Sequence, residues 1–364
     1  MRLAVVMLLS GLLSPLCADD APPRSLDERL TIELFAEQPQ LRTPTGIDVD
    51  HHGRVWVIES NTHFRPEDYD GHPSDRLLIL TDTDGDGRAD DVKTFADGFQ
   101  FAMSVAVRPV WLDEVRVESE ELGVESKEGD TAQTAPHAAP HNPQLTQVFL
   151  AERSGLWLLE DTDGDDLCDR RTKLVTLETE GNYPHNGLAG FAFDALGWMY
   201  FGLGENLGAP YKLVSREMAQ SPGVPDAFPQ DSQLSTLNSP LSGGGEGGNL
   251  YRMRPNGTHL THWATGFWNP HASCVDAFGR VFTVDNDPDS RPPCRLLHII
   301  EGGDYGFRFR NGRKGLHPFT SWNGEIPGTL PMVAGTGEAP SGILAYEHDA
   351  FPEEYLGNLF VTSW

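Results

Sequence analysis

The chain has 364 residues and a formal net charge of −27, because 27 Lys and Arg face 54 Asp and Glu. This acidity argues against nucleic acid and anionic membranes as partners, since both repel a negative surface. An uninterrupted apolar run of about 20 residues is absent, so no membrane-spanning helix is predicted. In contrast, 18 Phe, 8 Trp and 8 Tyr supply the bulky side chains of a folded core.

Residues 1–18 are predicted to be a secretory signal peptide. Met1 and Arg2 form a short basic start before the apolar run LAVVMLLSGLLSPL, and Ala18 offers a small residue for cleavage. We therefore expect an exported protein, periplasmic or extracellular, in which residues 19–40 lead into the folded part.

Three cysteines remain after removal of the signal peptide. In an oxidising compartment an odd number indicates one pair and one free thiol. Cys274 and Cys294 are the candidate pair, and two buried free cysteines are an alternative of equal weight.

A repeated pattern organises the chain from residue 41 to residue 364. Each copy has an Asp, a Gly three residues later and an aromatic residue three further on, within an apolar and β-branched segment. The pattern predicts a strand, a tight turn and a second strand. Because such hairpins recur without helical periodicity, the fold class is predicted to be all-β, a β-propeller. The copies occupy residues 46–60, 190–204 and 273–287.

About four and a half blades are predicted, beginning near residues 46, 104, 190, 272 and 341. The last of these stops at NLFVTSW, in a segment that resembles an inner strand. Because open edges of a sheet expose unpaired backbone groups, we expect a six-bladed propeller that is incomplete at the C-terminus of this chain.

Two stretches interrupt the blades. The run near residues 113–145 is polar and rich in Glu, Ala and Pro, so it is predicted to be a surface insert. The Pro-, Ser- and Gly-rich stretch near residues 207–248 is predicted to be a long loop.

Two acidic segments, TDTDGDGRADD and EDTDGDDLCDR, each follow an apolar strand in consecutive blades. Both place carboxylates at loop positions 1, 3, 5 and 9, and calcium is the cation that accepts this many hard oxygen ligands. Since the feature recurs from blade to blade, we predict structural calcium, with plain acidic turns as the alternative. The predicted ligands are Asp82, Asp84, Asp86 and Asp90 in the first loop and Asp161, Asp163, Asp165 and Asp169 in the second.

Residues that break the repeat are the candidates for function. His185 and Asn186 precede one inner strand, Glu205 ends the strand after it, and Trp268 and Asn269 precede the next inner strand. Ends of inner strands open onto the central channel of a propeller, where several blades can contact one ligand. His185 is a candidate general base whose tautomer Glu205 would set; a histidine that only bonds a backbone group is the alternative.

Three segments resemble the signatures of soluble quinoprotein glucose and sorbosone dehydrogenases: HNGLAGFAFDALGWMYFGLGE, GFWNPHASCVDAFGRVF and EGGDYGFRF. More closely, the chain resembles the membrane-bound dehydrogenase domain of planctomycete-type secreted haem-binding proteins. The phrases HNGLAGFAFD, GGGEGGN, GFWNP, DNDPDS and PGTLPMVAGTGEAP together carry that second resemblance. In that group a CxxCH haem segment commonly follows the propeller, so haem is expected only in a C-terminal part that this sequence lacks.

The resemblance implies that His185 removes a hydroxyl proton while hydride passes to pyrroloquinoline quinone. Glu205 stands where those enzymes carry an Asp that orients the base, and Asn269 matches the Asn beside the quinone. Asn186, Trp268 and Asn269 are the candidate cofactor contacts. Trp268 replaces the Arg of those enzymes, and an indole offers one donor and no charge.

The leading hypothesis is a calcium-stabilised propeller that oxidises a sugar or alcohol and passes electrons to a quinone or haem acceptor. The second is a calcium-dependent lactonase or esterase, in which carboxylates and Asn269 hold a cation in the channel. The third is a non-catalytic carbohydrate- or protein-binding propeller, because a fold alone does not fix a function. The expected partners are a small-molecule substrate and an electron acceptor.

Overall fold

The chain was analysed as a computed structural model that describes residues 24–113, 145–183, 185–217 and 240–363. These residues fall into two units, divided between Leu34 and Phe35. In the first unit, the described residues form turns without a strand, and Arg29 Nη2 lies 2.6 Å from Asp27 Oδ2. All strands described below belong to the second unit.

Several predicted segments lie outside the described residues. They are the signal peptide, nearly all of the predicted insert and the middle of the predicted long loop. Within the described part of the chain, no helix is long and apolar enough to cross a membrane.

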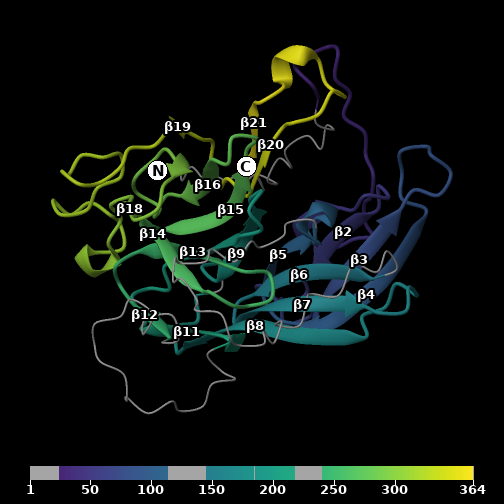
Figure 1. The fold of residues 1–364 in the computed structure, drawn as a ribbon, viewed down its shortest axis with the longest axis horizontal. Helices are drawn as coiled ribbons and strands as arrows, with labels where there is room; N and C mark the ends of the chain where they lie inside the picture. Colours follow the sequence, from purple (N-terminus) through teal and green to yellow (C-terminus); the bar gives the residue numbers. More distant parts are fainter. Residues whose placement is uncertain (1–23, 114–144, 184, 218–239, 364) are drawn as a thin grey trace, which may run out of the picture. The chain divides into compact units, whose positions relative to one another are not determined.

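The first two sheets are built from strands that mostly pair in chain order, and β6, β7 and β8 lie side by side in Figure 1. The first sheet contains β1 (Pro44–Val49), β2 (Val55–Glu59), β3 (Asp75–Thr81) and β4 (Asp91–Phe99). The second has the order β12-β11-β8-β7-β6-β5 and contains β5 (Ala102–Val107), β6 (Thr146–Glu152), β7 (Gly155–Asp161), β8 (Arg170–Thr179), β11 (Tyr211–Ser215) and β12 (Leu241–Gly243).

The remaining sheets continue the same scheme, and three short 3-10 helices connect strands in the part of the chain that the structure describes. The third sheet, in the order β18-β14-β13-β10-β9, contains β9 (Leu188–Phe193), β10 (Met199–Leu203), β13 (Gly248–Met253), β14 (Thr261–Phe267) and β18 (Gly303–Asp304). The fourth contains β15 (Asn269–Val275), β16 (Val281–Asn286), β17 (Arg295–Ile299) and β19 (Ala334–Gly335). The last pairs β20 (Gly342–Ala345) with β21 (Leu359–Thr362). The 3-10 helices are η1 (Val110–Asp113), η3 (Phe309–Asn311) and η4 (Glu353–Tyr355).

The first strands of successive sheets contact one another in turn: β1 with β5, β5 with β9, β9 with β15, and β15 with β20. Sheets whose first strands meet in this way are the blades of a propeller, so the predicted all-β propeller is confirmed. The predicted number of six blades is not confirmed, because the described residues form four blades and the two-stranded sheet of β20 and β21.

Apolar clusters fill the spaces between consecutive blades. Trp56, Phe95 and Leu150 pack between the first and second blades, whereas Phe149 and Phe201 pack between the second and third. Because each blade is covered on both faces, its middle strands are buried on both sides, which explains uninterrupted apolar runs such as LLIL in β3. Burial of each such large side chain contributes about 1.5–3 kcal/mol.

Two edge additions were not predicted from the sequence. The segment that carries β11 and β12 lies between β10 and β13 of the third blade, yet β11 pairs with β8 of the second, with Leu213 opposite Leu177. Likewise β18, which follows the fourth blade's β17, pairs in parallel with β14 of the third. Neighbouring blades are therefore joined by strands as well as by side-chain packing.

The predicted Asp–Gly–aromatic turns form as expected. In the third blade, Asp194 Oδ1 accepts the N–H groups of Leu196 and Trp198, each at 2.9 Å, and the Gly197 N–H donates to the Asp194 carbonyl at 3.0 Å. Gly197 has φ +76°, a left-handed conformation that favours glycine. Asp194 Oδ2 accepts the Tyr200 hydroxyl at 2.9 Å, so the aromatic of the repeat secures the turn as well as the core.

The turns of the other two copies are built alike. Asp50 Oδ2 accepts the indole N–H of Trp56 at 3.0 Å in the first blade. In the fourth blade Phe282 has no donor to offer, and Arg280 Nε binds Asp276 Oδ2 instead, at 2.6 Å.

The predicted disulfide is wrong, because Cys274 and Cys294 are both free and buried. They face different surroundings: Cys274 lies in β15 near the backbone of Ala345 in β20, whereas Cys294 contacts Asp287. Burial raises the pKa of the Cys274 thiol to about 12. The alternative of two buried free cysteines is therefore the one the structure shows.

Replacing Tyr200 by Phe tests the repeated turn. The variant removes the donor to Asp194 Oδ2 and leaves the ring in the core, so the free energy of unfolding should fall by about 1.5–3 kcal/mol, the range for hydrogen bonds to charged groups. Urea unfolding with an unchanged m-value measures this loss. A variant as stable as the parent would show that the hydroxyl does not secure the turn.

Candidate functional site

A polar cleft of about 350 Å³ lies where the inner strands of several blades meet. It brings together four residues that the sequence analysis selected: His185, Asn186, Trp268 and Asn269. Met103 of β5, His271 of β15 and Ser341 before β20 also line it, so residues in or next to strands of four sheets contribute. The volume lies in the range of small-molecule sites.

A buried carboxylate holds Trp268 and Asn269 in place. Asp285 of β16 is fully buried, and its Oδ1 accepts the backbone N–H groups of Trp268 at 3.0 Å and Asn269 at 2.7 Å. These bonds fix the backbone at the start of β15 and therefore the direction of both side chains. Burial raises the pKa of Asp285, and the adjacent Arg295 opposes that shift.

Arg295 of β17 lies opposite Asp285 in the strand pairing and is also fully buried. Its Nε lies 3.2 Å from Asp285 Oδ2, and its Nη1 donates to the carbonyls of Tyr305 and Trp322, each at 2.8 Å. The guanidinium stacks over the Trp322 ring, 3.6 Å from its centroid. One ion pair thus connects the cleft to the segments that follow β17.

Asn186, which lines the cleft, has a buried side-chain oxygen without a hydrogen-bond partner. Its Nδ2 donates to the Glu205 carbonyl at 2.6 Å, whereas its Oδ1 is buried and has no partner. The close approach of the strands requires Gly204, where a Cβ would lie 2.8 Å from Asn186 and from Asn269 Oδ1. A buried acceptor without a donor is costly, so this oxygen is suited to a ligand hydroxyl or N–H.

His185 lies among aromatic rings. Its ring centroid is 4.7 Å from that of His63, 5.0 Å from that of Phe64 and 5.3 Å from that of Tyr183. Burial lowers the pKa of His185, and the negative charge of Asp289 opposes that shift. The imidazole is therefore neutral near pH 7 and free to accept a proton.

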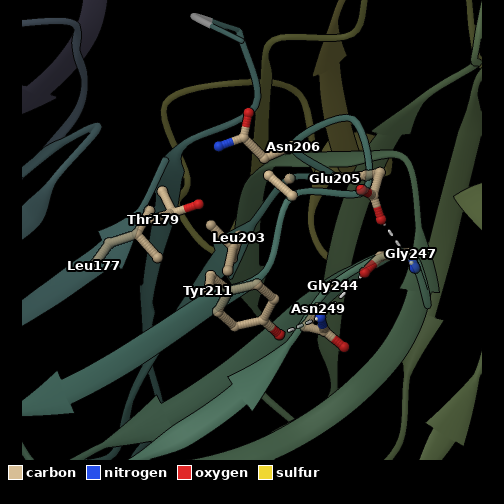
Figure 2. Close-up of a pocket in the computed structure, with 11 residues that line it drawn as sticks. Leu177, Thr179, Leu203, Glu205, Asn206, Tyr211, Gly244, Gly247 and Asn249 are labelled. Carbon is tan, nitrogen blue, oxygen red and sulfur yellow. Dashed lines mark hydrogen bonds between the residues drawn. The ribbon is translucent and has the colours of Figure 1, made fainter. Parts of the chain in front are cut away.

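Glu205 is not the partner of His185 that the sequence analysis predicted. Its Oε1 accepts the N–H of Gly208 at 2.6 Å and its Oε2 that of Gly247 at 3.1 Å, the latter drawn in Figure 2. Figure 2 shows it lining a separate void with Tyr211 and Asn249, and that void of about 10 Å³ holds at most one water. Glu205 is a scaffold residue whose backbone N–H also binds the Trp268 carbonyl, at 2.8 Å.

The acidic loops lie between β3 and β4 and between β7 and β8. The first aspartate of each loop accepts backbone N–H groups: Asp82 Oδ1 from Gly85 and Asp161 Oδ1 from Gly164, each at 2.7 Å. These bonds close the tight turns around which the other carboxylates gather.

Three of the four predicted ligands gather in each loop. Oxygens of the grouped carboxylates lie within 4.8 Å of one another, and Asp165 and Asp90 belong to neither group. Asp90 Oδ2 instead accepts the Thr83 N–H at 2.9 Å. Repulsion from Asp165 and Asp169 raises the pKa of Asp163, a shift that a bound cation would reverse. The groups, which fit a hard cation, are Asp82, Asp84 and Asp86, and Asp161, Asp163 and Asp169.

Sequence reasoning did not find Arg313, His63 or His271. Arg313 Nη2 lies 2.6 Å from Asp289 Oδ2, and its guanidinium is 5.5 Å from the ring centroids of both Tyr183 and Trp268. The basic run RFRNGRKG after the third signature was the available signal for Arg313. His63 lies in the loop after β2, where no motif marks it.

Pyrroloquinoline quinone carries three carboxylates, so a cleft that binds it needs positively charged side chains in its lining. Asp287, Asp289 and Glu338 line the cleft, and none of its described lining residues is a lysine or arginine. The nearby Arg313 is already paired with Asp289. Because buried carboxylates need positive partners, these residues do not fit the quinone.

Similarity to known proteins supports the fold of this chain but does not assign the chain to a family. A family model described as a domain of unknown function, DUF7133, matches residues 25–119. No curated protein matches the chain. A solved glucose dehydrogenase structure has a TM-score of 0.52 at 14% identity, covering 89% of this chain and 81% of that one.

Two further solved structures are similar. A second glucose dehydrogenase structure has a TM-score of 0.52 at 14% identity, covering 88% of this chain and 80% of the other. The pyrroloquinoline quinone-bound aldose sugar dehydrogenase of Streptomyces coelicolor has a TM-score of 0.46 at 14% identity, covering 83% and 71%. The two glucose dehydrogenases show that this propeller fold is shared with sugar dehydrogenases.

Histidine titration by NMR tests which carboxylate acts on His185. Asp289→Asn should lower the pKa of His185 further, because the Asp289 charge raises it. Glu205→Gln should leave that pKa unchanged and lower the melting temperature, since an amide cannot accept from both Gly208 and Gly247. The exposed Glu353→Gln serves as the control. A shift of the His185 pKa in Glu205→Gln alone would restore the predicted pair.

Proposed function

We propose that this chain is an oxidoreductase that binds a carbohydrate or small alcohol in the cleft and oxidises it, with His185 as general base. Electrons would pass to a separate quinone or haem acceptor. The observation that carries the proposal is the neutral imidazole of His185 beside the unpartnered Asn186 Oδ1 in one cleft. The fold shared with glucose dehydrogenases supports the choice of reaction.

The cleft is suited to a ligand with several hydroxyl groups. Asn186 Oδ1 would accept one hydroxyl, and the side chains of Asn269, Asn286 and Ser341 line the same space. A hydroxyl both donates and accepts, so one polyol can satisfy several such groups. The ring of Tyr183 adds an apolar surface for a sugar face.

Proton transfer to His185 fits its surroundings. As the alcohol is oxidised, its O–H proton moves to the neutral imidazole, and the hydrogen of the adjacent C–H bond leaves with its electron pair, as a hydride, for a two-electron acceptor of the quinone class. A carbonyl product results. The imidazolium that forms is stabilised by the negative charge of Asp289, which favours the protonated ring.

Replacement of His185 by Ala should lower kcat/KM by about 10²- to 10⁴-fold, the usual contribution of a general base. Reduction of a soluble dye with aldoses and alcohols, with and without added quinone, measures this. The exposed His259→Ala is the matched control and should retain full activity. In the parent protein kcat/KM should fall only below the ordinary histidine pKa, since the pKa of His185 is lowered.

Three outcomes would contradict the proposal. Unchanged turnover by His185→Ala would remove His185 from the mechanism. Cleavage of lactones or esters without dye reduction would favour the hydrolase. Sugar binding without any turnover would favour a binding protein.

We also propose that the protein is exported and that calcium binds both acidic loops as a structural ion. The signal-peptide pattern of residues 1–18 and the grouped carboxylates support these two points. Calcium is proposed to act on stability, because neither loop contributes a residue to the lining of the cleft.

Removal of calcium should lower the melting temperature. A ligand that binds only the folded state stabilises by RT ln(1 + [L]/Kd), about 2.7 kcal/mol at 100 times Kd. Calorimetry with calcium or excess chelator measures this. Asp161→Asn should reduce the difference, whereas Asp349→Asn, whose side chain is fully exposed, should not. Equal melting temperatures with and without chelator would contradict structural calcium.

A further inference from the structure

One wall of the cleft carries a thiol and two carboxylates that the proposed reaction does not use, although Asp287 Oδ2 also accepts the Arg291 N–H at 3.0 Å. One potential ligand atom from each of Asp287, Cys294 and Glu338 lies within 4.8 Å of the other two. Cys294 is buried, and Asp287 and Glu338 line the cleft. The group therefore lies at the boundary between the protein interior and the ligand space.

The backbone holds this group together. Asp287 and Cys294 begin and end the connection between β16 and β17, and the Asp287 N–H donates to Cys294 Sγ at 3.3 Å. Glu338 follows β19, and the Thr336 N–H donates to the Cys294 carbonyl at 2.8 Å, which keeps its segment beside the thiol. The Asp285–Arg295 pair lies at the start of the same connection.

Unpartnered polar atoms elsewhere in the cleft also indicate that a ligand binds there. Asn186 is only 1% exposed, and its Oδ1 has no hydrogen-bond partner. Its Nδ2 is bound to the Glu205 carbonyl, so Oδ1 is the atom left for the cleft. His271, which lines the same cleft, has a buried Nδ1 without a partner.

We propose that Asp287, Cys294 and Glu338 bind a divalent metal ion of the zinc class in the wall of the cleft. Sulfur selects this class, because calcium and magnesium take oxygen ligands whereas zinc accepts Cys, Asp and Glu together. Three protein ligands leave one tetrahedral position for a water or a ligand oxygen, as in zinc sites that are open to substrate.

A divalent ion bound here would hold Cys294 as the thiolate, with release of its proton. The site also gives a role to a buried cysteine that forms no disulfide.

Titration with Co²⁺, a spectroscopic substitute for Zn²⁺, tests the proposal on the whole chain. Saturating calcium is present, so that the all-oxygen acidic loops are occupied. We expect one Co²⁺ per chain with a thiolate-to-cobalt charge-transfer band in the near ultraviolet, competed away by Zn²⁺. Cys294→Ser should abolish the band, and Cys274→Ser, the other buried free cysteine, should retain it.

A second variant guards against misfolding of Cys294→Ser. Glu338 is exposed, so Glu338→Gln should fold normally and weaken Co²⁺ binding by more than about tenfold. Absence of the band in the parent protein, or a band that persists in Cys294→Ser, would overturn the proposal. The experiment measures metal binding alone, so its result tests the metal site separately from the proposed oxidation.

Discussion

The buried ion pair between Asp285 and Arg295 is the interaction on which the cleft depends. The carboxylate binds the two backbone N–H groups that begin β15, and the guanidinium binds carbonyls of the segments that follow β17. Both side chains are fully buried, so loss of either partner would leave an uncompensated charge at a cost of about 3–5 kcal/mol. The side-chain directions of Trp268 and Asn269 are thus set by two buried residues, Asp285 and Arg295, that do not line the cleft.

A buried carboxylate also accepts several backbone N–H groups in the first blade. Asp75 is fully buried, and its carboxylate accepts the backbone N–H groups of Asn61, Thr62 and Ala102 at 2.6–2.9 Å. These bonds fix the start of the loop that carries His63 and the start of β5. Acidic side chains in this protein therefore have two kinds of place: some gather N–H groups at buried strand ends, and others gather in the two acidic loops for which we propose calcium.

The parts of the fold that follow a local pattern could be predicted from the sequence. The Asp–Gly–aromatic turns and the acidic loops depend on residues a few positions apart, and strand ends that meet at the channel bring His185, Asn186, Trp268 and Asn269 together. The role of Glu205 could not be predicted, because Gly247 reaches it from 42 residues away. His63 and Arg313 likewise contact the cleft residues His185 and Asp289 from loops without periodicity, where spacing carries no information about direction.

The β11–β12 hairpin has a consequence for how the protein comes apart. It belongs to the third blade along the chain but completes the outer edge of the second. A stack of blades joined only by side-chain packing can open one neighbour at a time. Here β11 and β12 are covalently connected to the third blade but hydrogen-bonded to the second. We therefore expect these two blades to form one cooperative unit of local unfolding. The strands β11 and β12 therefore hold the second and third blades together.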